Sequence, residues 1–442
     1  MKSIEDIYAL FQKHPHAVTD SREIVPGCLF FALKGENFDG NAFAMQALEN
    51  GAAFAVANDP AVHHLDERII FVDNALSTMQ RLATCHRQQF DIPVLAITGT
   101  NGKTTTKDLV SAVLSSHFQT HYTKGNFNNH IGVPLTLLGM PPVTEISVVE
   151  MGANHPGEID LLCQIARPTH GLITNVGKAH LEGFGSFDGV KKAKAELYRY
   201  LATQGGTAFV NTDEPCLTEL AATNTKKLFY HRSEAPAMGH IPTEVKLVTT
   251  HPFLEVAFLS PAGKLINVRT KLAGDYNFNN LMTAIAVGKY FKVPAQKIKT
   301  ALENYRPANN RSQLLTTGTN TFLLDAYNAN PASMRLALSS FASMTSAHKI
   351  AILGAMRELG AFSEEEHETL TQFAVSLAFD QVIFVGKEFE AAAKKRSLLY
   401  FKTTAALREW FDKKQFAGKF FLIKGSRSIG LEKLLEPPSQ TS

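Results

Sequence analysis

The sequence has few of the features that mark a secreted or membrane-embedded protein. Its four cysteines are scattered without a CxxC pair, which argues against a disulfide framework or a zinc ribbon and favours a reducing compartment. No run approaches about 18 consecutive apolar residues, the length that a membrane-spanning helix needs. The first residues, MKSIEDIYALFQKHPH, lack the basic and then apolar order of a secretory signal. We therefore expect a cytoplasmic protein without a membrane span.

An excess of one charge is also missing. Lys and Arg total 44 against 41 for Asp and Glu, which gives a net charge of +3 over 442 residues. This balance provides no field that would attract nucleic acid, so no nucleic-acid partner is expected. The hydrophobic share of 45% against 19% charged residues excludes a mainly disordered chain. The length instead argues for two to four folded domains.

Strand-like and helix-like segments alternate along most of the chain. Short apolar runs rich in β-branched residues, such as 92–98, 146–151 and 171–176, are each followed by a helix-like segment. This alternation predicts an α/β fold with a parallel sheet covered on both faces. Residues 244–272 differ, because three β-rich runs joined by turn residues predict a small antiparallel sheet there.

The chain divides into three blocks where this pattern changes. Residues 1–90 mix short strands and helices, residues 91–305 begin with a strand and a glycine-rich turn, and residues 306–442 form a second α/β block. The sequence YRPANN at 305–310 is loop-like and lacks apolar periodicity, so it marks the boundary before the last block. Three domains with these bounds are therefore predicted.

The motif TGTNGKTT occupies residues 98–105, between a predicted strand and a predicted helix. Glycines allow the backbone to wrap a phosphate, and a helix N-terminus presents unpaired N–H groups to it. Lys103 would then reach the terminal phosphates, and the Thr104 hydroxyl would ligate Mg²⁺. The usual GxxxxGK[ST] motif needs glycine where Ile97 stands, so this is a compressed variant. The alternative is an ordinary turn with a solvent-facing lysine, which the strand–turn–helix context disfavours.

Acidic and imidazole side chains follow the ends of two predicted strands. Glu150 ends ISVVEMG, and His180 follows LITNV. The carboxyl ends of parallel strands line the ligand crevice of an open sheet, so both side chains are candidates for contact with a phosphate-bound metal. Lys194 lies on a predicted helix together with Lys191 and Lys192. Residue chemistry alone favours a solvated basic helix face for these three lysines.

Two asparagine-rich segments are candidates for recognising amide or carboxylate groups, because an amide side chain carries donors and acceptors together. KGNFNNHIGVP contains Asn126, Asn128 and Asn129. LLDAYNANP follows a predicted strand and contains Asp325, Tyr327, Asn328 and Asn330. Ordinary turn chemistry explains each segment equally well at this level.

Several motifs, occurring in order, make the chain similar to the Mur ligase family. They are TGTNGKTT, GNFNNHIG, VVEMGANHPGEI, AHLEGFGS, LAGDYNFNN and KGSRS. The resemblance runs from TDSR near residue 19 to KGSRS near residue 428, so it covers nearly the whole chain. Members of this family are ATP-dependent amide ligases that build the peptide stem of bacterial cell-wall precursors. GANHPGEI, AHLEGFGS, DAYNANPASM and GAMRELG make the chain most similar to the members that join D-alanyl-D-alanine to UDP-N-acetylmuramoyl-tripeptide.

The resemblance implies an N-terminal UDP-binding domain, a central P-loop ATP-binding domain and a C-terminal Rossmann-like domain. It also implies that a substrate carboxylate attacks the γ-phosphate of ATP to give an acyl phosphate, from which an amine displaces phosphate. The expected partners are the UDP-linked tripeptide and D-alanyl-D-alanine, and the expected cofactors are ATP and two Mg²⁺ ions. Because ligands are expected from all three domains, ATP and substrate together should close the molecule.

The resemblance also implies roles for particular residues. The expected catalytic groups are Lys103, His180 and a carbamylated Lys194, and the expected metal ligands are Thr104, Glu150, His180 and Lys194. The expected nucleotide-binding residues are Gly99, Thr100, Asn101, Gly102, Lys103, Thr104, Thr105, Asn277, Asn280, Arg311 and Asp325. The expected substrate-binding residues are Ser21, Arg22, Lys34, Gly35, Asn126, Asn129, Tyr327, Asn328 and Asn330. A carbamate would turn a lysine stem into an anionic oxygen ligand, which replaces the expectation of a solvated face for Lys194.

Some positions depart from the family pattern. Asn41 stands where histidine is usual, Tyr276 replaces a histidine before the first adenine-contacting asparagine, and Ala355 and Arg357 interrupt GDMxELG. These departures keep open a catalytically idle nucleotide-binding module, although the expected catalytic and metal-binding residues are unaltered. A second alternative is a folylpolyglutamate synthase of the same superfamily. The TDSR and ALKGENFDG segments argue against it, because folate ligases lack a UDP-binding domain.

Overall fold

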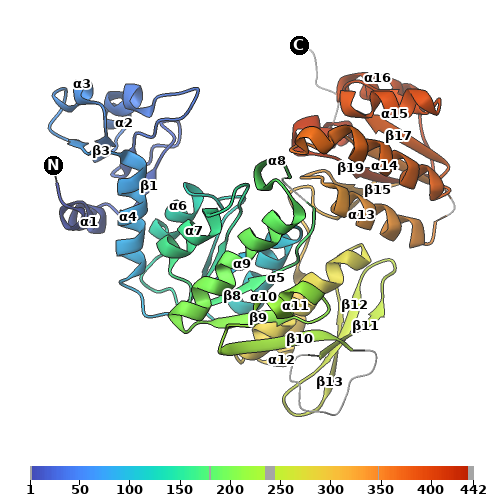
Figure 1. Ribbon diagram of the computed structural model, residues 1–442, viewed down its shortest axis with the longest axis horizontal. Helices are drawn as coiled ribbons and strands as arrows, with labels where there is room; N and C mark the ends of the chain where they lie inside the picture. Colours follow the sequence, from blue (N-terminus) through green and yellow to red (C-terminus); the bar gives the residue numbers. More distant parts are fainter. Residues whose placement is uncertain (1, 179–180, 234–243, 347, 437–442) are drawn as a thin grey trace.

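The computed structural model describes residues 2–178, 181–233, 244–346 and 348–436, and these contain three β-sheets that follow one another along the chain (Figure 1). We call the parts built around these sheets the N-terminal part (β1–β4), the central part (β5–β13) and the C-terminal part (β14–β19). In Figure 1 they run from blue, through cyan, green and yellow, to orange and red. Among the described residues, no helix combines the length and the apolar character needed to cross a membrane.

The N-terminal sheet is four-stranded and parallel, in the order β1-β2-β3-β4. Its strands are β1 (Ala17–Val18), β2 (Leu29–Phe31), β3 (Phe54–Ala57) and β4 (Ile69–Phe71), and its helices are α1 (Ile4–Lys13), α2 (Ala44–Glu49), α3 (Pro60–His63) and α4 (Ala75–Arg87). Phe11 of α1 and Met79 of α4 belong to the same buried cluster as Val133 and Leu162 of the central part. The N-terminal part is therefore fixed to the central part by apolar packing.

The central sheet has nine strands in the order β13-β12-β11-β10-β9-β8-β5-β7-β6. They are β5 (Val94–Thr98), β6 (Thr120–Tyr122), β7 (Ile146–Glu150), β8 (His170–Ile173), β9 (Thr207–Asn211), β10 (Lys226–Ser233), β11 (Glu244–Thr249), β12 (Glu255–Leu259) and β13 (Leu265–Arg269). The antiparallel strands predicted in residues 244–272 are confirmed as β11–β13. They do not form a separate sheet, because β11 pairs in parallel with β10 and so extends the main sheet.

Helices cover both faces of the parallel region of this sheet. The helices of the central part are α5 (Lys103–Ser115), α6 (Gly132–Leu138), α7 (Glu158–Ala166), α8 (Leu181–Phe184), α9 (Phe187–Gln204), α10 (Pro215–Leu220), α11 (Phe278–Tyr290) and α12 (Ala295–Asn304). Val94 and Ala96 of β5 pack in one core with α6, α7 and α9, whereas Leu95 and Ile97 pack in a second core with α5, α11 and α12. Both faces of β5 are buried, which explains its unbroken apolar run.

The C-terminal sheet has six strands in the order β14-β15-β19-β16-β17-β18, and only the β14–β15 pair is antiparallel. The strands are β14 (Gln313–Thr317), β15 (Asn320–Asp325), β16 (Lys349–Gly354), β17 (Gln381–Val385), β18 (Leu399–Phe401) and β19 (Phe420–Lys424). The helices are α13 (Pro331–Ser343), α14 (Ser363–Ser376), α15 (Glu390–Lys395) and α16 (Thr404–Lys414). Separate cores on the two faces make this part a second α/β layer structure, as the sequence predicts.

Candidate active site

A cavity of about 790 Å³ lies between the central and C-terminal parts. Its lining includes residues that follow the carboxyl ends of β5, β7 and β8 on one side and of β15 and β16 on the other. This edge of a parallel sheet is where ligands bind in open α/β folds. The predicted site residues in the lining are Thr100, Asn101, Gly102, Lys103, Thr104, Thr105, Asn126, Asn129, Glu150, Asn277, Asn280, Arg311, Asp325, Tyr327, Asn328 and Asn330.

Other predicted site residues do not line this cavity. Gly99 lies one residue before the first lining residue of the phosphate loop, and Lys194 is buried and is not among the lining residues. The four residues predicted to bind the uridine diphosphate belong to the N-terminal part, namely Ser21, Arg22, Lys34 and Gly35. His180 lies outside the described residues.

The turn between β5 and α5 has the backbone of a phosphate loop. Gly99 and Gly102 have φ angles of 141° and 78°, the region that favours glycine. A Cβ at Gly102 would lie 2.5 Å from Asn280 Oδ1, and a Cβ at Gly99 would collide with the Thr174 side chain. At the N-terminus of α5 the N-cap residue is Gly102, and no side chain that the structure describes caps the free N–H groups. These N–H groups and the positive end of the helix dipole suit a phosphate.

The Lys103 ammonium is held against this loop. Its Nζ donates to Gly99 O at 2.8 Å and to Thr100 O at 3.1 Å. Burial lowers the pKa of Lys103, and the positive Arg311 acts in the same direction, whereas Glu150 opposes it. Among the described residues, the hydrogen-bond partners of this ammonium group are carbonyl oxygens, and an anionic phosphate would be a better partner.

Glu150, at the end of β7, carries a carboxylate that is hydrogen-bonded to the first turn of α5. Its Oε1 accepts from Thr104 Oγ1 at 3.0 Å and from Asn128 Nδ2 at 2.8 Å. Its Oε2 is buried without a hydrogen-bond partner among the described residues. The described residues contain no group of three His, Cys, Asp or Glu side chains that could hold an ion by themselves. One carboxylate beside one hydroxyl fits Mg²⁺, which keeps several waters and is shared with substrate phosphates.

Lys194 of α9 is buried, with 2% of its surface exposed, whereas Lys192 is exposed. Lys194 Nζ lies 3.5 Å from Ala153 O and 5.4 Å from the centre of the Phe184 ring. Burial lowers the pKa of Lys194 to about 7, helped by the charge of Lys103 and opposed by Glu196 and Glu158. The solvated helix face expected from residue chemistry alone is therefore wrong for Lys194.

The two asparagines before and within α11 form a buried network. Asn280 Nδ2 donates to Asn277 Oδ1 at 2.9 Å, and Asn280 Oδ1 accepts from Thr106 Oγ1 at 2.9 Å. Asn277 occupies the N-cap position of α11, but its side chain makes no capping bond there and instead donates to Ala273 O and to Ser312 Oγ. Residue 276 takes part as well, because the Tyr276 hydroxyl lies 2.8 Å from Ser312 Oγ.

The C-terminal side of the cavity holds paired charges. Asp325 Oδ2 accepts from Lys424 Nζ at 2.6 Å, and the Lys424 side chain is 4% exposed. The guanidinium carbon of Arg311 lies 3.7 Å from the centre of the Tyr327 ring, and that of Arg427 lies 5.3 Å from it. An aromatic ring thus holds two cations beside the cavity.

A hydrogen bond between asparagine side chains also joins the two sides of the cavity. Asn330 Nδ2 donates to Asn101 Oδ1 at 2.7 Å, across 229 positions of sequence. Asn330 also forms a capping box with Ser333 at the start of α13. Turn chemistry likewise accounts for Asn129, whose Oδ1 accepts from the backbone of Ile131 and Gly132. Both asparagines therefore stabilise their own turns while lining the cavity.

Of the predicted residues of the N-terminal part, Arg22 and Lys34 are exposed and paired with acidic neighbours, whereas Ser21 and Gly35 are half-buried. Arg22 pairs with Asp20 at 2.6 Å, and Lys34 pairs with Asp39 at 3.2 Å. Asn41, which departs from the family pattern, is buried, and its Oδ1 accepts from the backbone N–H groups of residues 58 and 59. The asparagine therefore holds a turn of this part together.

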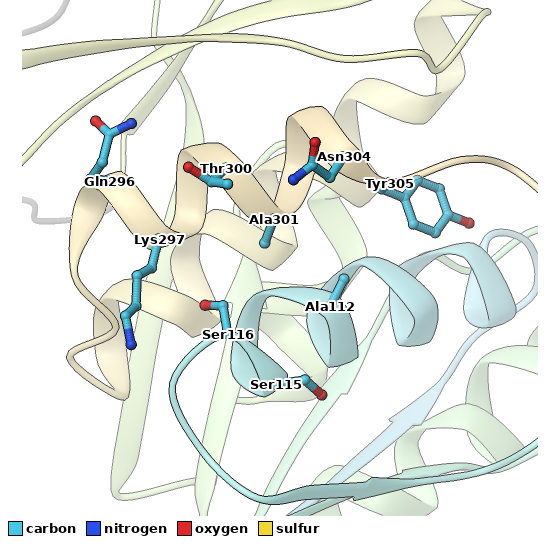
Figure 2. Close-up of a pocket in the computed structure, with 9 residues that line it drawn as sticks. All are labelled: Ala112, Ser115, Ser116, Gln296, Lys297, Thr300, Ala301, Asn304 and Tyr305. Carbon is cyan, nitrogen blue, oxygen red and sulfur yellow. The ribbon is translucent and has the colours of Figure 1, made fainter.

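A second hollow, of about 590 Å³, lies between the C-terminal end of α5 and helix α12 (Figure 2). Small and polar side chains line it, with Lys297 as the charged member. It is roughly 18 Å along α5 from the phosphate loop, at 1.5 Å of rise per residue. None of the predicted site residues that the structure describes lines this hollow.

Sequence reasoning missed three residues that shape the cavity. Asn175 Oδ1 accepts from the backbone N–H of Asn101 at 3.0 Å, Lys424 neutralises Asp325, and Glu358 lines the C-terminal side. Asn175 and Lys424 lie at strand ends, the same signal that identified Glu150. A position at a strand end therefore also indicates cavity residues whose side chains are neutral, such as Asn175, or paired, such as Lys424.

Three family models match the chain along most of its length. They are the Mur ligase family catalytic domain over residues 16–87, the Mur ligase middle domain over 97–288 and the Mur ligase glutamate ligase domain over 310–427. Two curated relatives are UDP-N-acetylmuramoyl-tripeptide–D-alanyl-D-alanine ligases. The one from Bacillus subtilis is 35% identical over 430 residues, covering 95% of this chain and 92% of that protein. The one from Escherichia coli is 35% identical over 431 residues, covering 94% and 92%.

Solved structures superpose on nearly the full length of the chain. A crystal structure of MurF from Acinetobacter baumannii superposes with a TM-score of 0.83 at 32% identity, over 95% of this chain and 92% of that one. MurF from Thermotoga maritima, in complex with ADP, superposes with a TM-score of 0.82 at 27% identity, over 98% and 97%. The described chain thus shares the three-domain α/β fold of these proteins.

Proposed function

The chain belongs to the Mur ligase family, and from that premise we propose that it joins D-alanyl-D-alanine to the terminal carboxyl group of a UDP-N-acetylmuramoyl-tripeptide, with conversion of ATP to ADP and phosphate. This reaction belongs to bacterial peptidoglycan precursor synthesis. The observation that carries the proposal is the shared cavity. It brings Lys103 and Glu150 of the central part opposite Arg311 and Asp325 of the C-terminal part.

The chemistry must overcome the low electrophilicity of a carboxylate. A carboxylate oxygen of the tripeptide attacks the γ-phosphorus, ADP leaves, and an acyl phosphate forms. The amine of the dipeptide then adds to the acyl carbon, loses a proton, and expels phosphate from the tetrahedral intermediate to leave an amide. Such a site works mainly by positioning the reactants and by neutralising phosphate charge.

Lys103 is proposed to stabilise the transferring phosphoryl group. Its ammonium lies beside the loop carbonyls of Gly99 and Thr100, within reach of a phosphate bound at the N-terminus of α5. Exchanging these neutral contacts for anionic phosphate oxygens gives shorter and stronger hydrogen bonds. Lys103 would then act throughout the transfer rather than only in ground-state binding.

Glu150 and Thr104 are proposed to hold Mg²⁺, which would neutralise phosphate charge when bound. Glu150 Oε2, which has no hydrogen-bond partner in the described part of the chain, and the adjacent hydroxyl of Thr104 supply the hard oxygen donors that this ion prefers. A second ion, with His180 as a ligand, is part of the same proposal. The role of His180 stays a prediction from the family motif.

Lys194 is proposed to carry a carbamate. A pKa of about 7 leaves much of the amine neutral near physiological pH, with its lone pair available. Attack of Nζ on CO₂ with loss of one proton gives an N-carboxylate of charge −1. The side chain then offers anionic oxygens in place of a buried ammonium, near the positive Lys103 and the metal-binding groups.

The remaining residues are proposed to bind the substrates and the nucleotide. Asn277 and Asn280 would contact adenine, while Arg311 and Asp325 would hold the nucleotide from the C-terminal side. The uridine diphosphate would contact Ser21, Arg22, Lys34 and Gly35 of the N-terminal part, and the peptide substrates would contact Asn126, Asn129, Tyr327, Asn328 and Asn330. The three predicted domains would close around them.

Release of phosphate from ATP tests the proposed reaction. With purified protein and Mg²⁺, phosphate should appear only when both the UDP-linked tripeptide and D-alanyl-D-alanine are present, together with an equal amount of the UDP-linked pentapeptide. No release with both substrates would support an idle module, and ligation of glutamate to a folate would support the folate alternative. Either result would overturn the proposal.

A further inference from the structure

Lys107 is a buried cation near the phosphate loop that no predicted role covers. It lies on α5, about one turn beyond Lys103, and only 2% of its surface is exposed. An ammonium group taken out of water costs free energy unless hydrogen bonds and an opposite charge compensate for the lost solvent. The groups that compensate Lys107 therefore indicate what this lysine holds in place.

The ammonium group of Lys107 contacts a carbonyl oxygen and a carboxylate. Its Nζ donates to Thr123 O at 2.9 Å and lies 2.8 Å from Asp108 Oδ1. Asp108 supplies the opposite charge from the next position of α5, so the pair adds little net charge. Thr123 belongs to a different element, because it directly follows β6. Lys107 therefore joins α5 to the end of β6.

Thr123 connects this contact to Glu150. It is fully buried, and its Oγ1 accepts from the backbone N–H of Glu150 at 3.0 Å. Its own backbone N–H donates to Val148 O at 3.0 Å. A continuous chain of hydrogen bonds thus runs from Lys107 on α5, through Thr123 after β6, to the backbone of Glu150 at the end of β7.

The carboxylate of Glu150 returns to the same helix. Its Oε1 accepts from Thr104 Oγ1 at 3.0 Å, and Thr104 lies about one turn before Lys107 on α5. Helix α5 therefore holds Glu150 at two places, at the carboxylate through Thr104 and at the backbone through Lys107 and Thr123. Glu150 Oε2, which has no hydrogen-bond partner among the described residues, is left available to a ligand.

We propose that Lys107 is a positioning residue of the magnesium site, which fixes Glu150 through Thr123 so that Oε2 faces an ion bound to the nucleotide phosphates. This inference rests on the proposed function, in which Glu150 and Thr104 hold that ion. Removal of a group that orients a metal ligand without touching the metal typically weakens metal binding about 10- to 100-fold. Because Asp108 neutralises Lys107, the pair acts through geometry and not through its charge.

Binding of ADP with and without Mg²⁺ tests this role. Isothermal titration calorimetry of the full chain gives the Kd of ADP in excess Mg²⁺ and in EDTA, and the ratio of these constants measures how much the ion tightens binding. Lys107→Met should reduce this ratio about tenfold and leave the Kd in EDTA within about twofold, because it displaces a metal ligand and not the nucleotide. Glu150→Gln should give the full loss. Lys192→Met, an exposed lysine of α9, is the matched control and should keep the wild-type ratio.

Variants of Thr123 test the path between Lys107 and Glu150. Thr123→Val is similar in shape and loses only the acceptor oxygen, so it should reduce the ratio as Lys107→Met does. Thr123→Ser keeps that oxygen and should keep the wild-type ratio. If Lys107 acts through Thr123, the double variant Lys107→Met/Thr123→Val should lose no more than the larger single loss, whereas independent effects would multiply. The Thr123 variants decide the question even if Lys107→Met does not fold.

The contrary outcomes are distinct. An unchanged ratio in Lys107→Met or in Thr123→Val would overturn the positioning role. A larger ratio in Lys107→Met would mean that its charge repels the ion, and equal weakening in Mg²⁺ and in EDTA would assign Lys107 to the fold alone, so either result would also overturn it. If wild-type protein binds ADP no more tightly in Mg²⁺ than in EDTA, the proposed magnesium site itself is wrong and the inference falls with it.

Discussion

The charged groups around the cavity differ sharply from those of the N-terminal part. Lys194 and Glu150 are 2% and 1% exposed. The side chains of Arg22 and Lys34 are 86% and 67% exposed and are paired with acidic neighbours. A buried charge carries a desolvation cost that an exposed ion pair avoids. Charged groups with a high desolvation cost therefore lie near the phosphate loop, where they can interact with phosphate or metal ions.

The largest effect is expected from the most central of these charges. Lys103→Met should lower kcat about 100- to 1,000-fold, because it removes the cation proposed to stabilise the transferring phosphoryl group. Single-turnover phosphate release measures this loss directly. The exposed Lys192→Met variant is the matched control. If Lys103→Met and Lys192→Met had comparable activity, the buried charge would contribute no more to catalysis than the exposed one, and the prediction would be wrong.

Lys194→Ala should lower turnover by about 100-fold, since an anionic group near the metal-binding residues is lost. Short carboxylates such as formate or acetate should restore part of the activity by occupying the vacated space. Rescue is measured as turnover against carboxylate concentration, with Lys192→Ala as the control. Full activity of Lys194→Ala without any added carboxylate would contradict the proposed carbamate.

The pH dependence of stability should also report on Lys194. Its pKa of about 7 in the folded chain lies below the value of about 10.4 expected when unfolded. Between these values the unfolded chain binds more protons, so the free energy of unfolding should rise with pH, by about 1 kcal/mol per pH unit. Denaturant unfolding in CO₂-free buffer from pH 7 to 9 should show this slope for wild type and a smaller one for Lys194→Met. Equal slopes would mean that the buried ammonium is not destabilised.

A smaller effect is expected at the contact between the two sides of the cavity. Asn330→Ala should lower the free energy of unfolding by about 1 kcal/mol, because it removes the N-cap of α13. Asn330→Ser keeps a capping oxygen but is too short to reach Asn101, so it should retain stability. Both variants should raise KM for ATP by several-fold if the Asn330–Asn101 bond matters for nucleotide binding. If Asn330→Ser had the wild-type KM for ATP, the Asn330–Asn101 bond would not contribute to nucleotide binding and Asn330 would act only as an N-cap.

The smallest effect on stability is expected in the N-terminal part. Arg22→Ala removes an exposed ion pair with Asp20 and should leave the melting temperature unchanged. It should still raise KM for the UDP-linked substrate about tenfold, because a charge-assisted contact to a phosphate is lost. Calorimetry and kinetics on the same sample check both statements. A clear fall in the melting temperature would show that Arg22 stabilises the fold, which would contradict its proposed role in substrate binding alone.

Much of the fold follows from local pattern. The apolar run of β5 and the glycine turn after it predict a strand, a loop and a helix, and all three are present. Strand β10 was not predicted, because its residues alternate irregularly between buried and exposed and carry no clear apolar period. The continuity of β11 with β10 depends on pairing between strands, which a local pattern does not contain.

For similar reasons, the sequence contains a signal for some features of the site and not for others. Lys194 shares its helix face with Val190, Leu197 and Leu201, at helical spacing, so periodicity did contain a signal for its burial. The contact between Asn101 and Asn330 had no such signal, since it joins two parts of the molecule 229 positions apart. The side-chain network of Tyr276 and Asn277 likewise depends on Ser312, which follows the predicted domain boundary.

The most direct test of the account is transfer of oxygen from the tripeptide to phosphate. The terminal carboxyl group of the UDP-linked tripeptide is labelled with ¹⁸O. In an acyl phosphate one of these carboxyl oxygens is bonded to phosphorus, and it stays on the phosphate when the amine displaces it. Mass spectrometry of the released phosphate should therefore find one ¹⁸O atom per phosphate from labelled carboxyl groups. Unlabelled phosphate, released at the same rate as the amide forms, would contradict the proposed reaction at the phosphate loop.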